Sequence, residues 1–192
     1  MVTRTREKLL TAEGFMDRLD EFWPAELIAG RVVRIDEETW IMANGGEHGL
    51  VRQNVGAAIH VFLAKNPIGF VFQNSGTKTK SHPDQVRFPD VAYFSRKRLP
   101  EGKIPRKNFP VVPDLAIEVV SPSDKWPRLL ARVEEFLAGG TKSCWVVDPE
   151  SRRVTIFRQG TEAKHLRPGD KLSKDPALPG FSVDVAEFFA GL

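Results

Sequence analysis

Residues 114–149 read DLAIEVVSPSDKWPRLLARVEEFLAGGTKSCWVVDP and contain two different hydrophobic patterns. The runs at 114–121 and 142–149 are nearly continuously apolar, which is typical of strands buried on both faces. Between them, residues up to about Leu137 have helical spacing, and two glycines follow. A strand, a helix and a strand in this order predict a βαβ unit with a parallel strand pair.

The segments around this unit predict further strands and helices. The expected elements are, in chain order, a helix over 11–22, a hairpin over 26–43 around an acidic turn at 36–38, a helix over 47–64, strands over 69–76 and 89–95, a central helix capped by Ser123 or Asp124, a strand over 153–158 and a short helix over 183–190. The sequence therefore predicts an α/β fold with a mixed central β-sheet flanked by helices.

Length and composition predict one globular domain. The chain has 192 residues, of which 41% are hydrophobic and 28% are charged, and both fractions are ordinary for a folded domain. We expect a single domain over 1–192, with an N-terminal helix at 11–22, a core at 26–165 and a C-terminal extension at 166–192.

Cysteine content and hydropathy exclude several protein classes. Cys144 is the sole cysteine, so a disulfide framework and a cysteine-based zinc site are excluded. The N-terminus lacks the apolar segment of a signal peptide, and no run approaches the roughly 18 apolar residues of a membrane span. We therefore expect a cytoplasmic protein with no membrane partner. The net charge of +3 is compatible with a nucleic-acid partner but does not by itself indicate one.

The chemistry of the chain must come from side chains outside the common short motifs. The sequence has no phosphate-binding glycine loop, no HExxH motif, no nucleophile elbow and no dinucleotide fingerprint. Glu118 lies in an apolar strand, where a carboxylate loses its hydration and needs a cation or hydrogen-bond donors. Asp90 opens another strand, and two carboxylates on adjacent strands can hold one hard divalent cation. The alternative interpretation is a buried salt bridge for Glu118 and a strand-entry residue for Asp90.

Two helices carry polar residues beside their apolar faces. At 100° per residue, Arg132 lies about 40° from Phe136, so it either leans toward the sheet or belongs to a solvated face of the helix. Arg128 is expected to be solvated. Glu47 and His48 fall within the apolar arc of the helix at 47–64 and either line a site or are structural. The structural alternative is an acidic residue favoured by the helix dipole and a core histidine.

Several strings together resemble a known family. They are ELIAGRVV at 26–33, EHG at 47–49, PDV at 89–91, DLAIEVVSPSD at 114–124 and WVVDP at 145–149. The chain resembles the Uma family of restriction-endonuclease-like proteins, a group within the PD-(D/E)XK nuclease superfamily. The resemblance runs from about residue 11 to the C-terminus.

The resemblance implies a restriction-endonuclease-like core with a divalent metal at one end of its sheet. Asp90 corresponds to the aspartate of the PD element, and Glu118 corresponds to the acidic residue of the (D/E)XK element. The backbone carbonyl of Val119 would be the third metal ligand. Glu26 matches a recurrent glutamate near the site, and His48 matches a recurrent histidine.

The chain departs from the family pattern at the lysine. Val120 stands two residues after Glu118, where the motif has lysine. The family commonly moves this lysine to the next helix in a K-x-x-x-Y pattern, which here is Arg132 followed by Phe136. The positive charge is kept, but arginine cannot act as a general base because its pKa exceeds about 12.

These observations lead to an expected function and an alternative. We expect metal-dependent hydrolysis of phosphodiester bonds in DNA, with Mg²⁺ or Mn²⁺ held by Asp90, Glu118 and the carbonyl of Val119. Arg132 would supply a fixed positive charge, and His48 or Glu26 would accept a proton. The alternative is a catalytically inactive nuclease-fold module that binds DNA or a protein partner.

Basic residues and symmetry give two further expectations about partners. Lysine and arginine concentrate at 78–80, 96–107 and 125–132, and these segments would contact phosphates if they flank the site. A homodimer is compatible with this function, because cleavage of two strands suits a two-fold assembly, but no pattern in the sequence indicates an interface.

Overall fold

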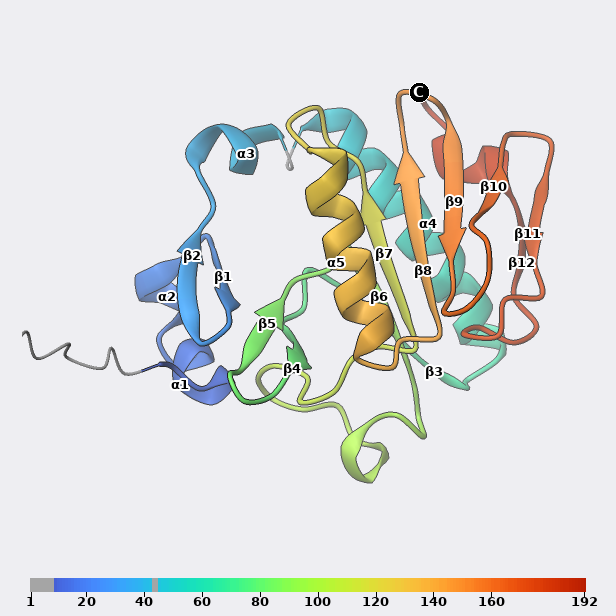
Figure 1. The fold of residues 1–192 in the computed structure, drawn as a ribbon. Coiled ribbons are helices and arrows are strands. Elements are labelled where there is room, and N and C mark those ends of the chain that lie inside the picture. Colours follow the sequence, from blue (N-terminus) through green and yellow to red (C-terminus); the bar gives the residue numbers. More distant parts are fainter. Residues whose placement is uncertain (1–8, 43–44) are drawn as a thin grey trace, which may run out of the picture.

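The central sheet lies between two helices. The computed structural model describes residues 9–42 and 45–192, and in these residues the central sheet has six strands in the order β10-β9-β8-β7-β6-β3 (Figure 1). The strands are β3 (Gly69–Gln73), β6 (Val91–Ser95), β7 (Leu115–Val119), β8 (Ser143–Asp148), β9 (Arg153–Phe157) and β10 (Lys164–Leu166).

The middle of this sheet is the βαβ unit expected from residues 114–149. Strands β7 and β8 pair in parallel, with Glu118 opposite Val146, and the other pairs in the sheet are antiparallel. Helix α5 (Trp126–Ala138) connects β7 to β8. Strand β6 is the other neighbour of β7, so the prediction of a mixed α/β fold is confirmed, and the strands beside Asp90 and Glu118 are adjacent.

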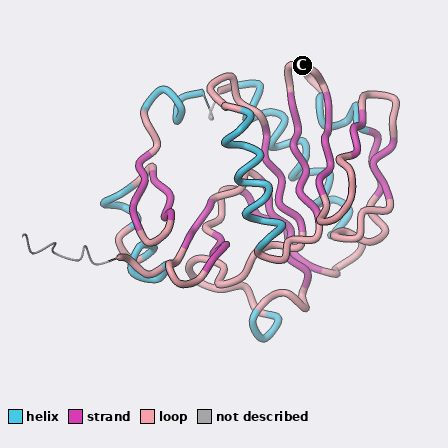
Figure 2. The backbone as a smooth tube through the Cα atoms, viewed as in Figure 1, coloured by secondary structure: helices cyan, strands magenta, loops and turns pink. Residues whose placement is uncertain are grey.

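One helix covers each face of the sheet, as Figures 1 and 2 show. Helix α4 (Gly46–Lys65) packs Val55 and Ile59 into a cluster with Leu115 and Ile117 of β7. On the other face, α5 packs its apolar stripe against Ala116 and its neighbours on β7 and β8. The alternation of side chains along β7 therefore directs Glu118 to the face that α5 covers.

The last part of the chain joins the cluster on the α4 face. Leu172 and Phe188 belong to the same buried cluster as the apolar residues of α4 and β7. The segment is a small hairpin followed by a short 3-10 helix, whose bounds are β11 (Lys171–Ser173), β12 (Ser182–Asp184) and η2 (Val185–Phe189).

A second sheet, ordered β2-β1-β5-β4, stands beside α5 (Figure 1). Leu27 on β1 pairs with Val86 on β5 in antiparallel register, which places Glu26 opposite Arg87. The elements of this part are α1 (Ala12–Met16), α2 (Leu19–Phe22), β1 (Ala25–Ile28), β2 (Arg31–Arg34), α3 (Glu37–Met42), β4 (Thr77–Lys80), β5 (Gln85–Arg87) and η1 (Pro100–Gly102).

The prediction of a hairpin over 26–43 is wrong in its second half. The hairpin turns at Ala29 and Gly30, both at positive φ, and ends at Arg34. The acidic segment is not a turn: the side chain of Asp36 accepts hydrogen bonds from the backbone and hydroxyl of Thr39, and α3 follows. Capping by Asp36 thus outweighs the β-propensity of the residues after it.

Smaller differences concern helix ends. The helix expected over 11–22 is two short helices, α1 and α2, and the terminal helix expected over 183–190 is a strand followed by a 3-10 helix. Helix α5 begins after Lys125 rather than after Ser123 or Asp124, because the Asp124 carboxylate accepts instead from Ser121. Across the part of the chain that the structure describes, no helix is long and apolar enough to cross a membrane.

Candidate functional site

Glu118 and Arg132 form a buried ion pair between β7 and α5. Glu118 is 4% exposed, and its Oε2 lies 3.1 Å from Nη2 of Arg132. The other carboxylate oxygen, Oε1, is buried and has no hydrogen-bond partner among the described residues. The lean of Arg132 toward the sheet, one of the two alternatives that its helical angle allows, is therefore present, and Arg128 is exposed as expected.

Asp90 meets the same end of the sheet from the α4 side. Its Oδ2 accepts a hydrogen bond of 2.8 Å from the backbone N–H of Val119, beside Glu118. His48 Nε2 lies 3.4 Å from the same oxygen, and Arg52 lies 4.0 Å from Oδ1. The N-terminal half of α4 therefore supplies two side chains that face Asp90, because residues four apart share one helix face.

A second cation, Arg87, binds two further carboxylates beside Arg132. Nη1 of Arg87 donates to Glu26 at 2.6 Å, and Nε and Nη2 each donate to a different oxygen of Glu135 at 2.7 Å. Glu26 also lies 3.8 Å from Arg132. The cluster thus alternates acidic and basic groups from both sheets and from α4 and α5.

The protonation of Glu118 depends mainly on its burial. Loss of hydration raises the pKa of Glu118 to about 8, although Arg132 opposes this shift. The negative charges of Asp90 and Glu26 raise the pKa of Glu118 further. The acidic surroundings in turn keep the pKa of Arg132 well above its usual range, so Arg132 stays charged.

The donor set fits a hard divalent cation that keeps part of its water shell. Within residues 9–42 and 45–192, no group of three or more His, Cys, Asp and Glu side chains is placed to hold a metal ion. Mg²⁺ needs fewer protein ligands, because it commonly binds one or two carboxylates together with waters and substrate phosphates. Oε1 of Glu118, which is buried and unpartnered among the described residues, is an oxygen of the type that such a cation binds.

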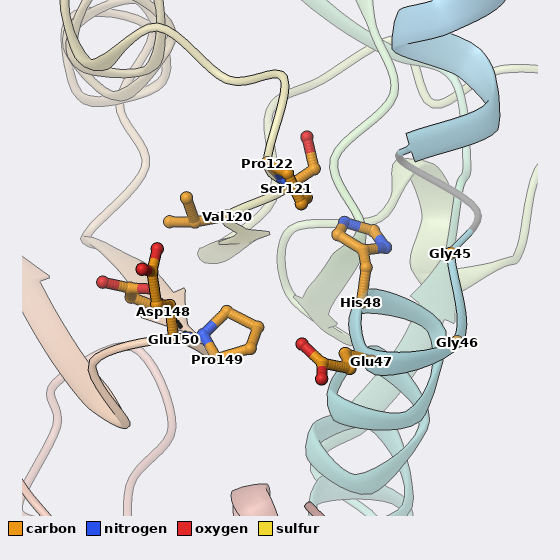
Figure 3. Close-up of a pocket in the computed structure, with 10 residues that line it drawn as sticks. All are labelled: Gly45, Gly46, Glu47, His48, Val120, Ser121, Pro122, Asp148, Pro149 and Glu150. Carbon is orange, nitrogen blue, oxygen red and sulfur yellow. Dashed lines mark hydrogen bonds between the residues drawn. The ribbon is translucent and has the colours of Figure 1, made fainter.

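A pocket of about 260 Å³ adjoins the cluster at His48 (Figure 3). It lies at the carboxyl ends of the parallel strands β7 and β8, where open α/β sheets commonly bind ligands. Its lining residues are Gly45, Gly46, Glu47, His48, Val120, Ser121, Pro122, Asp148, Pro149 and Glu150. In Figure 3, Glu47 lies on one side of the pocket and Asp148 and Glu150 lie on the other, so the lining carries several acidic side chains.

The basic segments do not all lie near the cluster. Residues 125–132 stand at the end of β7 that carries Glu118. The segments at 78–80 and 96–107 lie at the other end, where Lys80 and Arg98 line a separate pocket beside Gly139, the residue that ends α5. The condition that all three segments flank the site is therefore not met.

The structure brings together all the side chains nominated from the sequence. Asp90, Glu118, Arg132, His48 and Glu26 belong to one cluster, which the backbone N–H of Val119 contacts, whereas the nominated group of Val119 is its carbonyl. Sequence reasoning missed Arg52, Arg87 and Glu135. Arg52 and Glu135 could have been found as the helical neighbours of His48 and Arg132, whereas Arg87 lies on a three-residue strand without a usable pattern.

Comparisons with known proteins agree with this architecture. The Uma2 family model, described as "Putative restriction endonuclease", matches residues 20–186. A crystal structure of a "putative nuclease belonging to DUF820" from Anabaena variabilis ATCC 29413 has the same fold, with a TM-score of 0.76 and 19% sequence identity. The similarity covers 94% of this chain and 98% of that one. No curated protein matches the chain.

Proposed function

The chain belongs to the Uma2 family, and on this premise we propose that it is a nuclease that hydrolyses phosphodiester bonds in DNA with a divalent cation. The observation that carries the proposal is the pairing of two acidic side chains at one end of the sheet. Asp90 binds the backbone beside Glu118, and one oxygen of Glu118 is left without a partner in the described residues. Buried polar atoms are usually hydrogen-bonded, so an unpartnered carboxylate oxygen supports a role in binding a ligand.

Asp90, Glu118 and the carbonyl of Val119 would hold the cation, Mg²⁺ or Mn²⁺. When bound, it would polarise the scissile phosphate and increase the acidity of a water molecule. Glu118 must be ionised to act as a ligand, and its high pKa means that cation binding and proton release are coupled.

Arg132 would hold the substrate phosphate as a fixed positive charge. Its guanidinium stays protonated, and its side chain is about one quarter exposed, so a substrate phosphate would approach it from that open side. His48 would accept the proton from the attacking water, since its imidazole lines the pocket and its Nε2 lies 3.4 Å from Asp90. Glu26 is the second candidate acceptor, because it lies within the same cluster.

Lys125 and Arg128 would contact the backbone of DNA next to the scissile phosphate. Both are exposed near the start of α5, at the end of the sheet that carries Glu118. Phosphate contacts of this kind give affinity without reading sequence. The homodimer, the single domain over 1–192 and the cytoplasmic location stay predictions from the sequence.

Titration calorimetry with Mn²⁺ separates an active nuclease from the inactive module. We expect binding heat for the wild type and none for Glu118→Gln or Asp90→Asn, because each variant removes a charged ligand. Glu134→Gln, an exposed change on α5, is the matched control and should bind like the wild type. Equal heats for all four proteins, or no heat for any, would favour the module that binds DNA or a protein without catalysis.

A further inference from the structure

We propose that Arg87 is a positioning residue that occupies Glu26 and Glu135 and so leaves Arg132 available to Glu118. The inference rests on the proposed nuclease function for its catalytic consequence. Its structural part, the competition between two arginines for the same carboxylates, stands without that function.

All three nitrogens of the Arg87 guanidinium are engaged. The side chain is 8% exposed, and its hydrogen bonds of 2.6–2.7 Å reach one oxygen of Glu26 and both oxygens of Glu135. A planar guanidinium can make such a two-sided contact, whereas a lysine ammonium is a single point of charge. Arg87 therefore pairs with two carboxylates from two different elements, β1 and α5.

Both of those carboxylates are natural partners for Arg132. Glu135 stands three residues after Arg132 on α5, a spacing at which opposite charges pair on a helix surface. Glu26 lies 3.8 Å from Arg132, compared with 3.1 Å between Glu118 and Arg132. Because Arg87 holds Glu135 on both oxygens and Glu26 on one, the shorter contact of Arg132 is the one with Glu118.

Removing Arg87 would change which carboxylate pairs with Arg132. Glu26 and Glu135 would then be left with buried or half-buried negative charge, and Arg132 is the nearest remaining cation to Glu26. A buried charge without a partner is costly, so Arg132 should turn toward Glu26 and Glu135. Glu118 would lose its counter-charge, and the proposed phosphate contact would move away from the scissile position.

Nuclear magnetic resonance of the arginine side chains tests the competition directly. In Arg87→Met we expect the guanidinium signals of Arg132 to shift from their wild-type positions. In Arg87→Met/Glu135→Gln, where one competitor is also removed, they should return toward those positions. The Arg132 signals are assigned by their loss in Arg132→Lys. Unchanged Arg132 signals in Arg87→Met would overturn the proposal, whether or not the protein cleaves DNA.

Cleavage kinetics test the catalytic consequence. We expect kcat to fall on the order of 10²-fold in Arg87→Met with little change in KM, and to recover partly in the double variant. Arg158→Met is the control: it removes a comparable ion pair with buried Asp175, so it should lower Tm and leave kcat unchanged.

Arg87→Lys keeps the proposal testable if Arg87→Met does not fold. Lysine retains the charge but cannot bridge both carboxylates, so the Arg132 signals should shift from their wild-type positions, and kcat should fall while Tm stays near the wild-type value. A loss of kcat that only follows Tm across all variants would contradict positioning. A wild type that cleaves nothing would refute the nuclease function and leave the spectroscopic result to decide on Arg87.

Discussion

Glu118→Gln should make the metal-free protein more stable at alkaline pH and should remove most of its pH dependence above pH 5. Glu118 is buried, and loss of hydration raises its pKa from 4.5 in the unfolded chain to about 8 in the fold. Between these values the folded state binds a proton that the unfolded state has released. The free energy of unfolding therefore falls as pH rises, by at most about 1.4 kcal/mol per pH unit.

Between the two pKa values of Glu118, the total loss of unfolding free energy is at most about 5 kcal/mol, and it is complete once the pH has risen above 8. Urea unfolding of both proteins in chelator, from pH 5 to pH 9, measures the difference. We expect the two to be similar near pH 5 and the variant to gain steadily above it, whereas Glu134→Gln should follow the wild type. A difference that is independent of pH, or that favours the wild type as pH rises, would mean that Arg132 keeps Glu118 ionised, and it would refute the reasoning.

Three other sets of variants test the proposed phosphate contacts of Arg132 and Arg128 and the buried ion pair of Asp175. Arg132→Lys should keep much of the cleavage activity because the charge survives, whereas Arg132→Ala should lose on the order of 10²-fold in kcat, as measured on a fluorescent duplex. Arg128→Ala should weaken DNA binding and reduce the slope of log affinity against log salt by about 0.9, as measured by anisotropy, with kcat unchanged at saturation. Asp175→Asn should cost about 3–5 kcal/mol of unfolding free energy, because Asp175 is buried and accepts from Ser143, Trp145 and Arg158; a stable variant would contradict this role.

The sequence was most informative where one element carries its own pattern. The apolar runs on both sides of α5 predicted the parallel pair, because a strand that is buried on both faces has a nearly continuous hydrophobic sequence. Alternation along β7 assigned Glu118 to one face of the strand, and the angle of Arg132 on α5 allowed that side chain to lean toward the sheet, where the structure pairs the two. Both inferences use only the local geometry of a regular element.

The parts that could not be predicted depend on contacts between distant segments. Arg87 lies on a strand too short for periodicity, and its role follows from the pairing of β5 with β1, which no local pattern encodes. The residues after Asp36 include Thr39 and Trp40, which favour strands, yet the Asp36 side chain caps a helix there. The different partners of Arg87 and Arg132 could be recognised only from the arrangement of both sheets against α5.

Cleavage of supercoiled plasmid in the presence of Mg²⁺ or Mn²⁺, with Asp90→Asn beside the wild type, tests the nuclease proposal most directly. Asp90→Asn preserves the size of the side chain and an oxygen that can accept from Val119, but it removes the charge that a cation requires. We expect the wild type to nick or linearise the plasmid only with added cation, Asp90→Asn to be inactive, and Glu134→Gln to match the wild type. Cleavage that persists equally in Asp90→Asn, or that proceeds in chelator, would contradict the assignment of the two carboxylates as the centre of the activity.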